Sequence, residues 1–185
     1  MKASSQKFMK IKTKFKIVCI CQVYNEIEKG NLKRFFEYTK PLVDDIVIYD
    51  DGSTDGSYEY SLGQTPYVLR GGKNNFKNEI VHRQLMLKKA LELSPDFILW
   101  LDADEILSAQ SKKELYDVCA ECIEKNSDAV AIKELNIWRS HTWHRLDSLY
   151  NQGWFTRLWK VVSGLDFQEI KPGLHQDLFH QQLKR

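Results

Sequence analysis

The stretch Ile46-Val47-Ile48-Tyr49-Asp50-Asp51-Gly52-Ser53-Thr54-Asp55-Gly56-Ser57 runs from an apolar segment of strand length into a turn rich in acidic, hydroxyl and glycine residues. Carboxylates at the end of a buried strand need partners, because an unpaired charge removed from water is costly. Adjacent Asp50 and Asp51 therefore indicate a ligand with hydrogen-bond donors, such as a nucleobase and a ribose. A well-capped turn is the alternative, since the two glycines allow a sharp turn and residues 53–55 can cap a following helix.

Apolar runs of strand length recur on both sides of this stretch, and segments with helical periodicity separate them. This alternation predicts an α/β fold in a single domain, with a mostly parallel sheet covered by helices on both faces. In such a sheet, ligands lie beyond the carboxyl ends of the strands. The expected strands are residues 16–23, 45–50, 67–70, 97–101 and 129–135, and the expected helices are residues 31–39, 78–93 and 111–125.

Composition supports one cored domain, since the chain has 185 residues, of which 43% are apolar. Six lysines and no acidic residue precede residue 17, and the remainder carries more acids than bases. A basic arm, residues 1–15, on an acidic body argues against a general nucleic-acid binder. The arm is either a solvated tail or a contact for an anionic lipid or polymer. It lacks the apolar core of a secretory signal, so we expect a cytoplasmic protein, with peripheral contact at the inner face of the membrane as the alternative.

Four cysteines occur in pairs, Cys19 with Cys21 and Cys119 with Cys122. Such spacing raises the question of a zinc site. The first pair, however, lies within an apolar run typical of a buried strand, and the second pair lies on one face of an expected helix. We therefore expect reduced thiols in the core, as is usual in a cytoplasmic protein.

Asp102 and Asp104 directly follow the apolar run at residues 97–101, and strand alternation places both side chains on the same side. Two close carboxylates repel each other unless a cation or separate donors neutralise them. A hard divalent ion, Mg²⁺ or Mn²⁺, completed by substrate phosphates, resolves that repulsion. The alternative is the acidic first turn of a helix, where the negative charge favours the helix dipole.

Together, three motifs in order resemble those of family 2 glycosyltransferases, which have the GT-A fold. The resemblance covers roughly residues 15 to 107 and its third motif has the Asp-Ala-Asp-Glu form of one branch of that family. The motifs are Val18-Cys19-Ile20-Cys21-Gln22-Val23-Tyr24-Asn25-Glu26, the Ile46 to Ser57 stretch, and Ile98-Leu99-Trp100-Leu101-Asp102-Ala103-Asp104-Glu105.

The resemblance implies a role for each matching residue. Asp102 would face the ribose or the sugar, Asp104 would hold the metal that bridges the diphosphate, and Arg83 would point at the donor unless it is an ordinary exposed helix arginine. His175 would complete the metal shell, with a solvated loop histidine as the alternative, in a stretch where the branch more often has Glu in place of Gln176. The nucleoside-binding residues would be Gln22, Tyr24, Asn25, Glu26, Asp50 and Asp51.

The resemblance is thinner after residue 110, although residues 154–160 and 171–177 resemble later motifs of the same branch. The aromatic segment at residues 137–154 suits stacking on an acceptor sugar, and ordinary loop packing is the alternative. His141 and His144 lack an evident third ligand for zinc. We therefore divide the domain, residues 16–185, into a nucleotide-binding half at about 16–107 and an acceptor half at about 108–185, which is short compared with longer relatives.

The activity implied is a metal-dependent, inverting transfer of a sugar from a nucleoside diphosphate, UDP favoured, to an acceptor hydroxyl of a glycan, a lipid-linked glycan or another molecule. Synthesis of cell-surface polysaccharide is the expected setting. Inversion in one step needs a general base, and the sequence leaves five carboxylates open: Glu134, Asp147, Asp166, Glu169 and Asp177. A GT-A domain that binds nucleotide or glycan without turnover is the alternative. Dinucleotide-binding and P-loop motifs do not occur.

Overall fold

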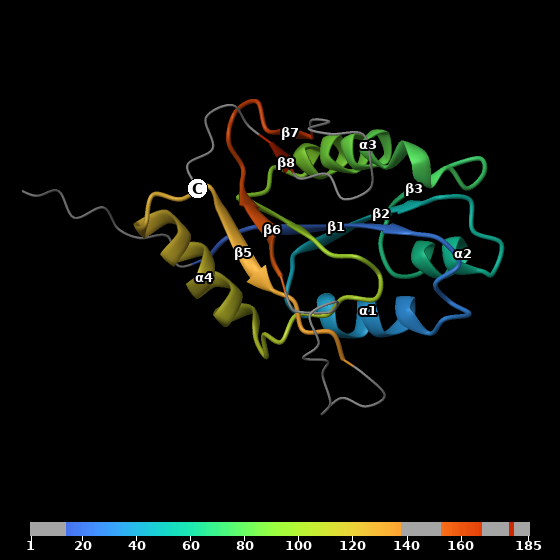
Figure 1. Ribbon diagram of the computed structural model, residues 1–185, viewed down its shortest axis with the longest axis horizontal. Coiled ribbons are helices and arrows are strands. Elements are labelled where there is room, and N and C mark those ends of the chain that lie inside the picture. Colours follow the sequence, from blue (N-terminus) through green and yellow to red (C-terminus); the bar gives the residue numbers. More distant parts are fainter. Residues whose placement is uncertain (1–13, 138–152, 168–177, 180–185) are drawn as a thin grey trace, which may run out of the picture.

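A computed structural model describes residues 14–137, 153–167 and 178–179. They form a six-stranded sheet in the order β3-β2-β1-β4-β6-β5 and a two-stranded sheet of β7 and β8 (Figure 1). The strands are β1 (Ile17–Val23), β2 (Asp45–Asp50), β3 (Tyr67–Arg70), β4 (Phe97–Trp100), β5 (Ala129–Lys133), β6 (Trp154–Lys160), β7 (Asp166–Phe167) and β8 (Leu178–Phe179). The helices are α1 (Asn31–Thr39), α2 (Ser57–Leu62), α3 (Glu79–Glu92) and α4 (Lys112–Glu124), and a short 3₁₀ helix (Phe76–Asn78) precedes α3.

The sheet divides the core into two layers, because side chains alternate between its faces. Cys19 and Cys21 of β1 pack with α1 and α4 on one face. Val18 and Ile20 pack with α3 on the other face, where β7 also lies (Figure 1). The expected fold class, an α/β domain with a mostly parallel sheet and helices on both faces, is confirmed.

Local sequence explains most of the element boundaries. In α1, the buried residues Leu32, Phe35 and Phe36 recur at helical spacing, and Pro41 follows soon after the last turn. The Ser111 side chain accepts a hydrogen bond from the backbone N–H of Glu114 and so caps α4, as expected. All four cysteines are buried and unoxidised, which confirms core thiols.

The structure differs from the sequence prediction at several places. β5 ends at Lys133 and not at residue 135, and β7 and β8 were not expected as strands. β6 was not expected as a strand, and it lies antiparallel between β4 and β5, with Leu99 opposite Leu158. Phe15, which the sequence assigned to the basic arm, is a core residue in edge contact with Phe97. The packed body therefore begins earlier than predicted, and residues 1–13 of the arm lie outside the described residues. Within the described ranges, no helix is long and apolar enough to cross a bilayer.

Candidate active site

The candidate site lies beyond the strand ends on the face that α3 covers. Ile20, Tyr49, Trp100 and Trp159 belong to the core layer under α3. Because side chains alternate, the residues two positions further along the parallel strands, Gln22, Asp51 and Asp102, point to the same face. Arg157, which precedes Trp159 by two positions on the antiparallel β6, joins them there. Strand order thus arranges them as Asp51, Gln22, Asp102 and Arg157.

A cavity of about 230 Å³ opens at this edge of the sheet. Its walls combine four carboxylates, one guanidinium and three aromatic rings, so it offers charge for a polar ligand and ring faces for a planar one. It is lined by Gln22, Tyr24, Glu26, Phe76, Glu79, Arg83, Trp100, Asp102, Ala103 and Asp104.

Arg83 provides the guanidinium of the cavity. Its side chain is 2% exposed, forms an ion pair with Glu79 one turn earlier on α3, and lies with its Cζ 3.4 Å from the centroid of the Trp100 ring. Burial requires such partners, because a desolvated charge without them is unstable. The alternative of an ordinary exposed helix arginine is therefore wrong.

The turn after β4 is stabilised by hydrogen bonds within the turn and by an arginine of β6. The backbone N–H of Asp102 donates to Glu105 Oε2 at 3.0 Å, and the N–H of Glu105 donates to the carbonyl of Asp102 at 3.0 Å. Arg157 forms an ion pair with Glu105 and lies 3.7 Å from Asp102 Oδ2. Burial raises the pKa of Glu105 to about 7, although Arg157 acts in the opposite direction. Asp104, in contrast, is exposed.

The Asp50–Asp51 turn finds partners inside the protein. Asp50 Oδ1 accepts hydrogen bonds from the N–H groups of Gly52 and Ser53. Asp51, on the α3 side, accepts from the backbone N–H of Asn75 at 3.0 Å and from the Asn74 side chain at 3.2 Å. Both carboxylates are fully buried, and burial raises the pKa of Asp51. Three of the four carboxylate oxygens therefore find donors in the chain itself, contrary to the expectation of an external ligand, whereas the buried Asp50 Oδ2 has no hydrogen-bond partner among the described residues.

Asn25 and Asp55 connect the loop after β1 to the same turn. Asn25 has a left-handed φ of 53°, donates its N–H to Ser53 Oγ, and accepts from the N–H of Thr54. Asp55 accepts from the N–H groups of Ile27 and Glu28 as well as from Ser57. Asp55 thus joins the loop after β1 to Ser57, the first residue of α2, whose N-cap position is held by Gly56 without a side-chain bond. Ser53 and Thr54 bond Asn25 instead and do not cap the helix.

The structure places some of the predicted site residues at the cavity and others behind it. All three predicted catalytic residues, Arg83, Asp102 and Asp104, line the cavity. Of the predicted nucleoside-binding residues, Gln22, Tyr24 and Glu26 line it. Asn25, Asp50 and Asp51 do not, and they brace the loops behind it.

Several predictions fall outside the described residues. His175, His141, His144 and most of the aromatic segment are among them, as are Asp147, Glu169 and Asp177. Of the five general-base candidates, Glu134 and Asp166 are described. Glu134 is close enough to contribute to the raised pKa of Glu105, whereas Asp166 belongs to β7, which packs against α3.

Sequence reasoning did not assign four of the cavity residues to the site: Phe76, Glu79, Trp100 and Ala103. It also missed three residues that support the site, namely His82, Glu105 as an ion-pair partner, and Arg157 as the cation that pairs with Glu105. Glu79 could have been found, because it precedes Arg83 by four positions on one helix. His82 occupies the buried face of α3 and lies 3.1 Å from Gln22. No local pattern predicts the Arg157 contact, which joins segments far apart in the sequence.

The donor set fits a hard divalent ion. Asp102 and Asp104 line one cavity, and Mg²⁺ in nucleotide sites is commonly held by one or two carboxylates together with substrate phosphates. Across the part of the chain that the structure describes, no three His, Cys, Asp or Glu side chains are grouped as a metal site. The described residues therefore fit a shared protein and substrate shell rather than a cage built by protein alone.

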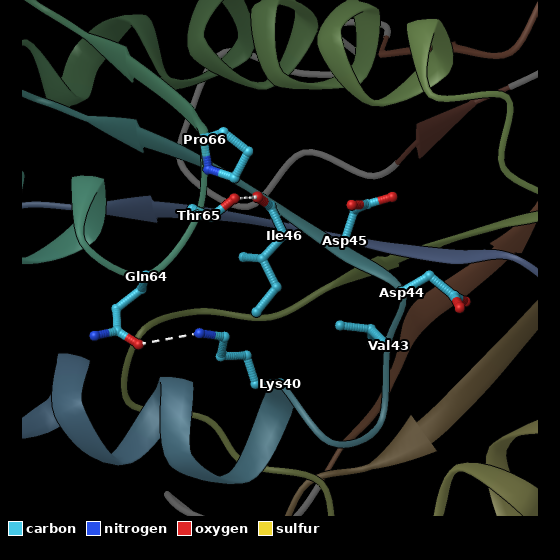
Figure 2. Close-up of a pocket in the computed structure, with 8 residues that line it drawn as sticks. All are labelled: Lys40, Val43, Asp44, Asp45, Ile46, Gln64, Thr65 and Pro66. Atoms are coloured by element: carbon cyan, nitrogen blue, oxygen red, sulfur yellow. Dashed lines mark hydrogen bonds between the residues drawn. The ribbon is translucent and has the colours of Figure 1, made fainter.

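A second cavity, of about 220 Å³, lies at the opposite end of β2 (Figure 2). Its polar groups bond to one another or to neighbouring elements: Lys40 Nζ donates to Gln64 Oε1 at 3.3 Å, and Thr65 Oγ1 donates to the Ile46 carbonyl at 2.6 Å. Asp44 accepts from the N–H of Ile17 and pairs with Lys112. This cavity is a seam between α1 and β2 and offers no chemistry comparable to the first.

Comparisons with protein-family models and with curated proteins find no match for this sequence. Among solved structures, the chain is similar to S. aureus TarS 1-349 in complex with UDP-GlcNAc, with a TM-score of 0.50 and 22% identity over 72% of this chain and 37% of that chain. It is also similar to S. aureus TarS, with a TM-score of 0.50 and 20% identity over 72% of this chain and 23% of that one. The mannosyltransferase PcManGT from Pyrobaculum calidifontis is a weaker match, with a TM-score of 0.47 and 17% identity over 65% and 36% of the two chains.

These likenesses concern the fold. They show that the described residues have the GT-A arrangement that the three sequence motifs predicted. The matched part spans well under half the length of each neighbouring chain.

Proposed function

We propose that this protein transfers a sugar from a nucleoside diphosphate, with UDP favoured, to the hydroxyl of a glycan or another acceptor, in a metal-dependent reaction with inversion. One observation carries the proposal: the cavity at the strand ends combines the buried Arg83 with Asp102 and the exposed Asp104. A diphosphate needs positive charge, and the carboxylates need a cation, so a metal–diphosphate complex satisfies both. The TarS structure with UDP-GlcNAc makes UDP the first nucleotide to test.

Each residue has a defined task under this proposal. Asp104, with Asp102, would hold Mg²⁺ or Mn²⁺, and His175 is a further candidate ligand. When bound, the ion supplies positive charge against the negative charge that develops on the leaving diphosphate. Arg83 contributes a second positive charge at the same cavity, held in place by Glu79 and the Trp100 ring. Such preorganised charge is effective because it needs no reorganisation during the reaction.

The nucleoside would bind at Gln22, Tyr24 and Glu26, which line the cavity. Asp51 and Asp50 would support that position through the loops that they hold, as would Asn25. We assign no general base: of the five candidates, the described Glu134 and Asp166 do not line the cavity. The base would take the proton of the acceptor hydroxyl as the sugar is transferred.

Calorimetric titration tests the donor site. We expect one of UDP, GDP, dTDP and CDP to bind with Mn²⁺ present and to bind at least about tenfold more weakly in EDTA. Asp104→Asn should reduce the gain in nucleotide affinity that Mn²⁺ gives. Because Asp104 is exposed, the substitution should leave the fold intact. Asp117→Asn, an exposed carboxylate on α4, is the matched control. Metal-dependent binding that is unchanged in Asp104→Asn would sink the assignment of the metal ligand.

The second candidate is a domain that binds nucleotide or glycan without turnover. It is favoured by the internal donors to Asp50 Oδ1 and to Asp51, which stabilise that turn without a substrate. Release of sugar from the bound donor, by transfer or by hydrolysis, separates the two. A binding domain would release none over hours at micromolar protein.

A further inference from the structure

The amide of Gln22 has one partnered atom and one without a partner. Its Nε2 lies 3.1 Å from His82 Nδ1. Its Oε1 is buried, and no hydrogen-bond partner for it exists among the described residues. A buried acceptor without a donor destabilises the protein, and native proteins rarely leave one unless a water or a ligand completes it. Since Gln22 lines the candidate cavity, this oxygen is a candidate contact for the ligand.

His82 determines which atom of the amide is left over. The ring stacks on Tyr49, with centroids 4.2 Å apart and planes at 17°, and its Nε2 lies 3.9 Å from Asp51 Oδ1. Burial lowers the pKa of His82, so the ring is neutral and carries one N–H. The nearby Asp51 carboxylate favours the proton on His82 Nε2, which leaves His82 Nδ1 as an acceptor. His82 Nδ1 then accepts a hydrogen bond from the side-chain N–H of Gln22, so Gln22 Oε1 needs a donor from elsewhere.

Asp51 is fixed in turn by the segment that follows β3. Its two oxygens accept from the N–H of Asn75, and Asn74 donates to Oδ2. Gln22 itself is opposite Tyr49 in the β1–β2 pairing. The chain Asp51, His82, Gln22 therefore runs from a rigid turn to the cavity wall and gives the amide one preferred orientation.

The cavity that Gln22 lines has ring faces that suit a base as well as carboxylates that suit a metal-bound diphosphate. Tyr24 and Phe76 line the same cavity and offer ring faces, whereas Asp102 and Asp104 belong to the turn after β4. Gln22 belongs to β1, which lies between β2 and β4 in the sheet. A nucleotide with its phosphates at the carboxylates can therefore bring its base toward Gln22.

We propose that His82 is a positioning residue that, by orienting Gln22, makes the donor site select bases with a ring N–H over bases without one. Uracil, thymine and guanine carry that N–H, whereas the corresponding ring nitrogen of cytosine and adenine is an acceptor and would face Oε1 unfavourably. This inference rests on the proposed function, because it requires that the cavity binds a nucleoside diphosphate.

Two substitutions of His82 test the role of Nδ1. His82→Phe keeps a ring over Tyr49 but removes the acceptor, and His82→Asn restores an acceptor oxygen close to the position of Nδ1. We expect the wild-type protein with Mg²⁺ to bind UDP at least about tenfold more tightly than CDP. His82→Phe should reduce this ratio to about twofold, and His82→Asn should recover most of it. Val81→Ala, exposed on the same helix, should leave the ratio unchanged.

The ratio is the decisive readout, because a general loss of packing would weaken both nucleotides alike. A wild-type preference for CDP, or a UDP to CDP ratio that is unchanged in a folded His82→Phe protein, would overturn the inference while leaving the proposed function in place. If the wild-type protein binds none of UDP, GDP, dTDP and CDP, the proposed function fails and the inference fails with it. Circular dichroism of each variant confirms that the protein compared is folded.

Discussion

The guanidinium carbon of Arg83 lies 3.4 Å from the centroid of the Trp100 ring, so a helix residue and a strand residue form one wall of the candidate cavity. Trp100 is the last residue of β4 and directly precedes the turn that carries Asp102. The arginine is therefore fixed relative to the carboxylates on which the proposed chemistry depends.

Arg83→Lys should lower kcat/KM roughly 10- to 100-fold, which corresponds to a loss of about 1.4 to 2.7 kcal/mol of transition-state stabilisation. Lysine keeps the charge but loses the planar group that stacks on Trp100 and pairs with Glu79. Steady-state kinetics with the donor found by calorimetry measures the effect. Lys88→Met, exposed on the same helix, is the control and should have wild-type activity. Full activity of Arg83→Lys would show that the guanidinium has no part in the reaction.

The ion pair of Arg157 and Glu105 should couple β6 to the turn after β4. Arg157→Gln should reduce the free energy of unfolding by about 2 to 4 kcal/mol, because it leaves the largely buried Glu105 carboxylate without its cation. Glu105→Gln should cost less, because Arg157 keeps Asp102 Oδ2 at 3.7 Å and the substitution removes a carboxylate whose ionised form burial disfavours. The double variant should lose about 1 to 3 kcal/mol less than the sum of the two single variants. Urea unfolding of all four proteins at pH 8 gives the coupling. Simple additivity would mean that the contact contributes nothing to stability.

Gly52→Ala should destabilise the protein by about 3 kcal/mol or more. A Cβ at Gly52 would lie 2.7 Å from Lys73 Cα, and the residue has a left-handed φ of 79°. Two matched variants separate these causes. Gly56→Ala, with a φ of 90° and open space, should lose only about 1 to 2 kcal/mol, and Gly72→Ala, with open space and no positive φ, should stay within about 0.5 kcal/mol of the wild type. If Gly52→Ala and Gly56→Ala lowered the free energy of unfolding equally, the clash with the Lys73 backbone would not contribute to the effect.

Asp55→Asn should destabilise the protein more at neutral pH than in acid. Burial acts to raise the pKa of Asp55, but hydrogen bonds from Ser57, Glu28 and Ile27 outweigh it and lower that pKa. A lowered folded-state pKa stabilises the protein above the unfolded-state value of about 3.9, and this contribution disappears as the pH falls through the folded-state value. We expect Asp55→Asn to lose about 1 to 3 kcal/mol at pH 7.

Unfolding in urea at pH 7 and at pH 3 checks this prediction. The two proteins should differ most at pH 7, and the difference should be smaller at pH 3, below the unfolded-state pKa of about 3.9. Asp117→Asn, in an exposed ion pair on α4, should differ from the wild type by less than about 1 kcal/mol at both values. A difference of equal size at both pH values would mean that the carboxylate charge of Asp55 is not what holds the loop after β1.

Sequence patterns predicted those parts of the fold that depend on neighbouring residues. β1, β2 and β3 and the three expected helices follow from apolar runs and helical spacing, and their observed bounds lie within one residue of the prediction. β6 could not be found in this way, because its place between β4 and β5 depends on partners distant in the sequence. The same limit applies to Arg157.

The candidate site was predicted in outline, since Asp102 and Asp104 directly follow a buried strand and both line the cavity, although they lie in the turn after β4 and not in the strand itself. Sequence patterns do not reveal which groups donate hydrogen bonds to the buried carboxylates. The sequence predicted that Asp50 and Asp51 need an external ligand, yet Ser53 and Asn75 supply donors from the chain itself to Asp50 Oδ1 and to Asp51. Their partners come from a turn and a loop that no periodic pattern describes.

The insertion of β6 beside β4 has a consequence for biosynthesis. Until residues 154–160 have left the ribosome, β4 is the edge of an unfinished sheet, with an open row of backbone groups and an apolar flank. Because the strand that closes this edge is encoded late, the sheet has high contact order, and its completion is expected to be a slow step. A shortened chain that stops at residue 107 would keep all the residues of the β1 and β4 motifs and still expose an adhesive edge, so we expect it to self-associate rather than to serve as an isolated nucleotide-binding module.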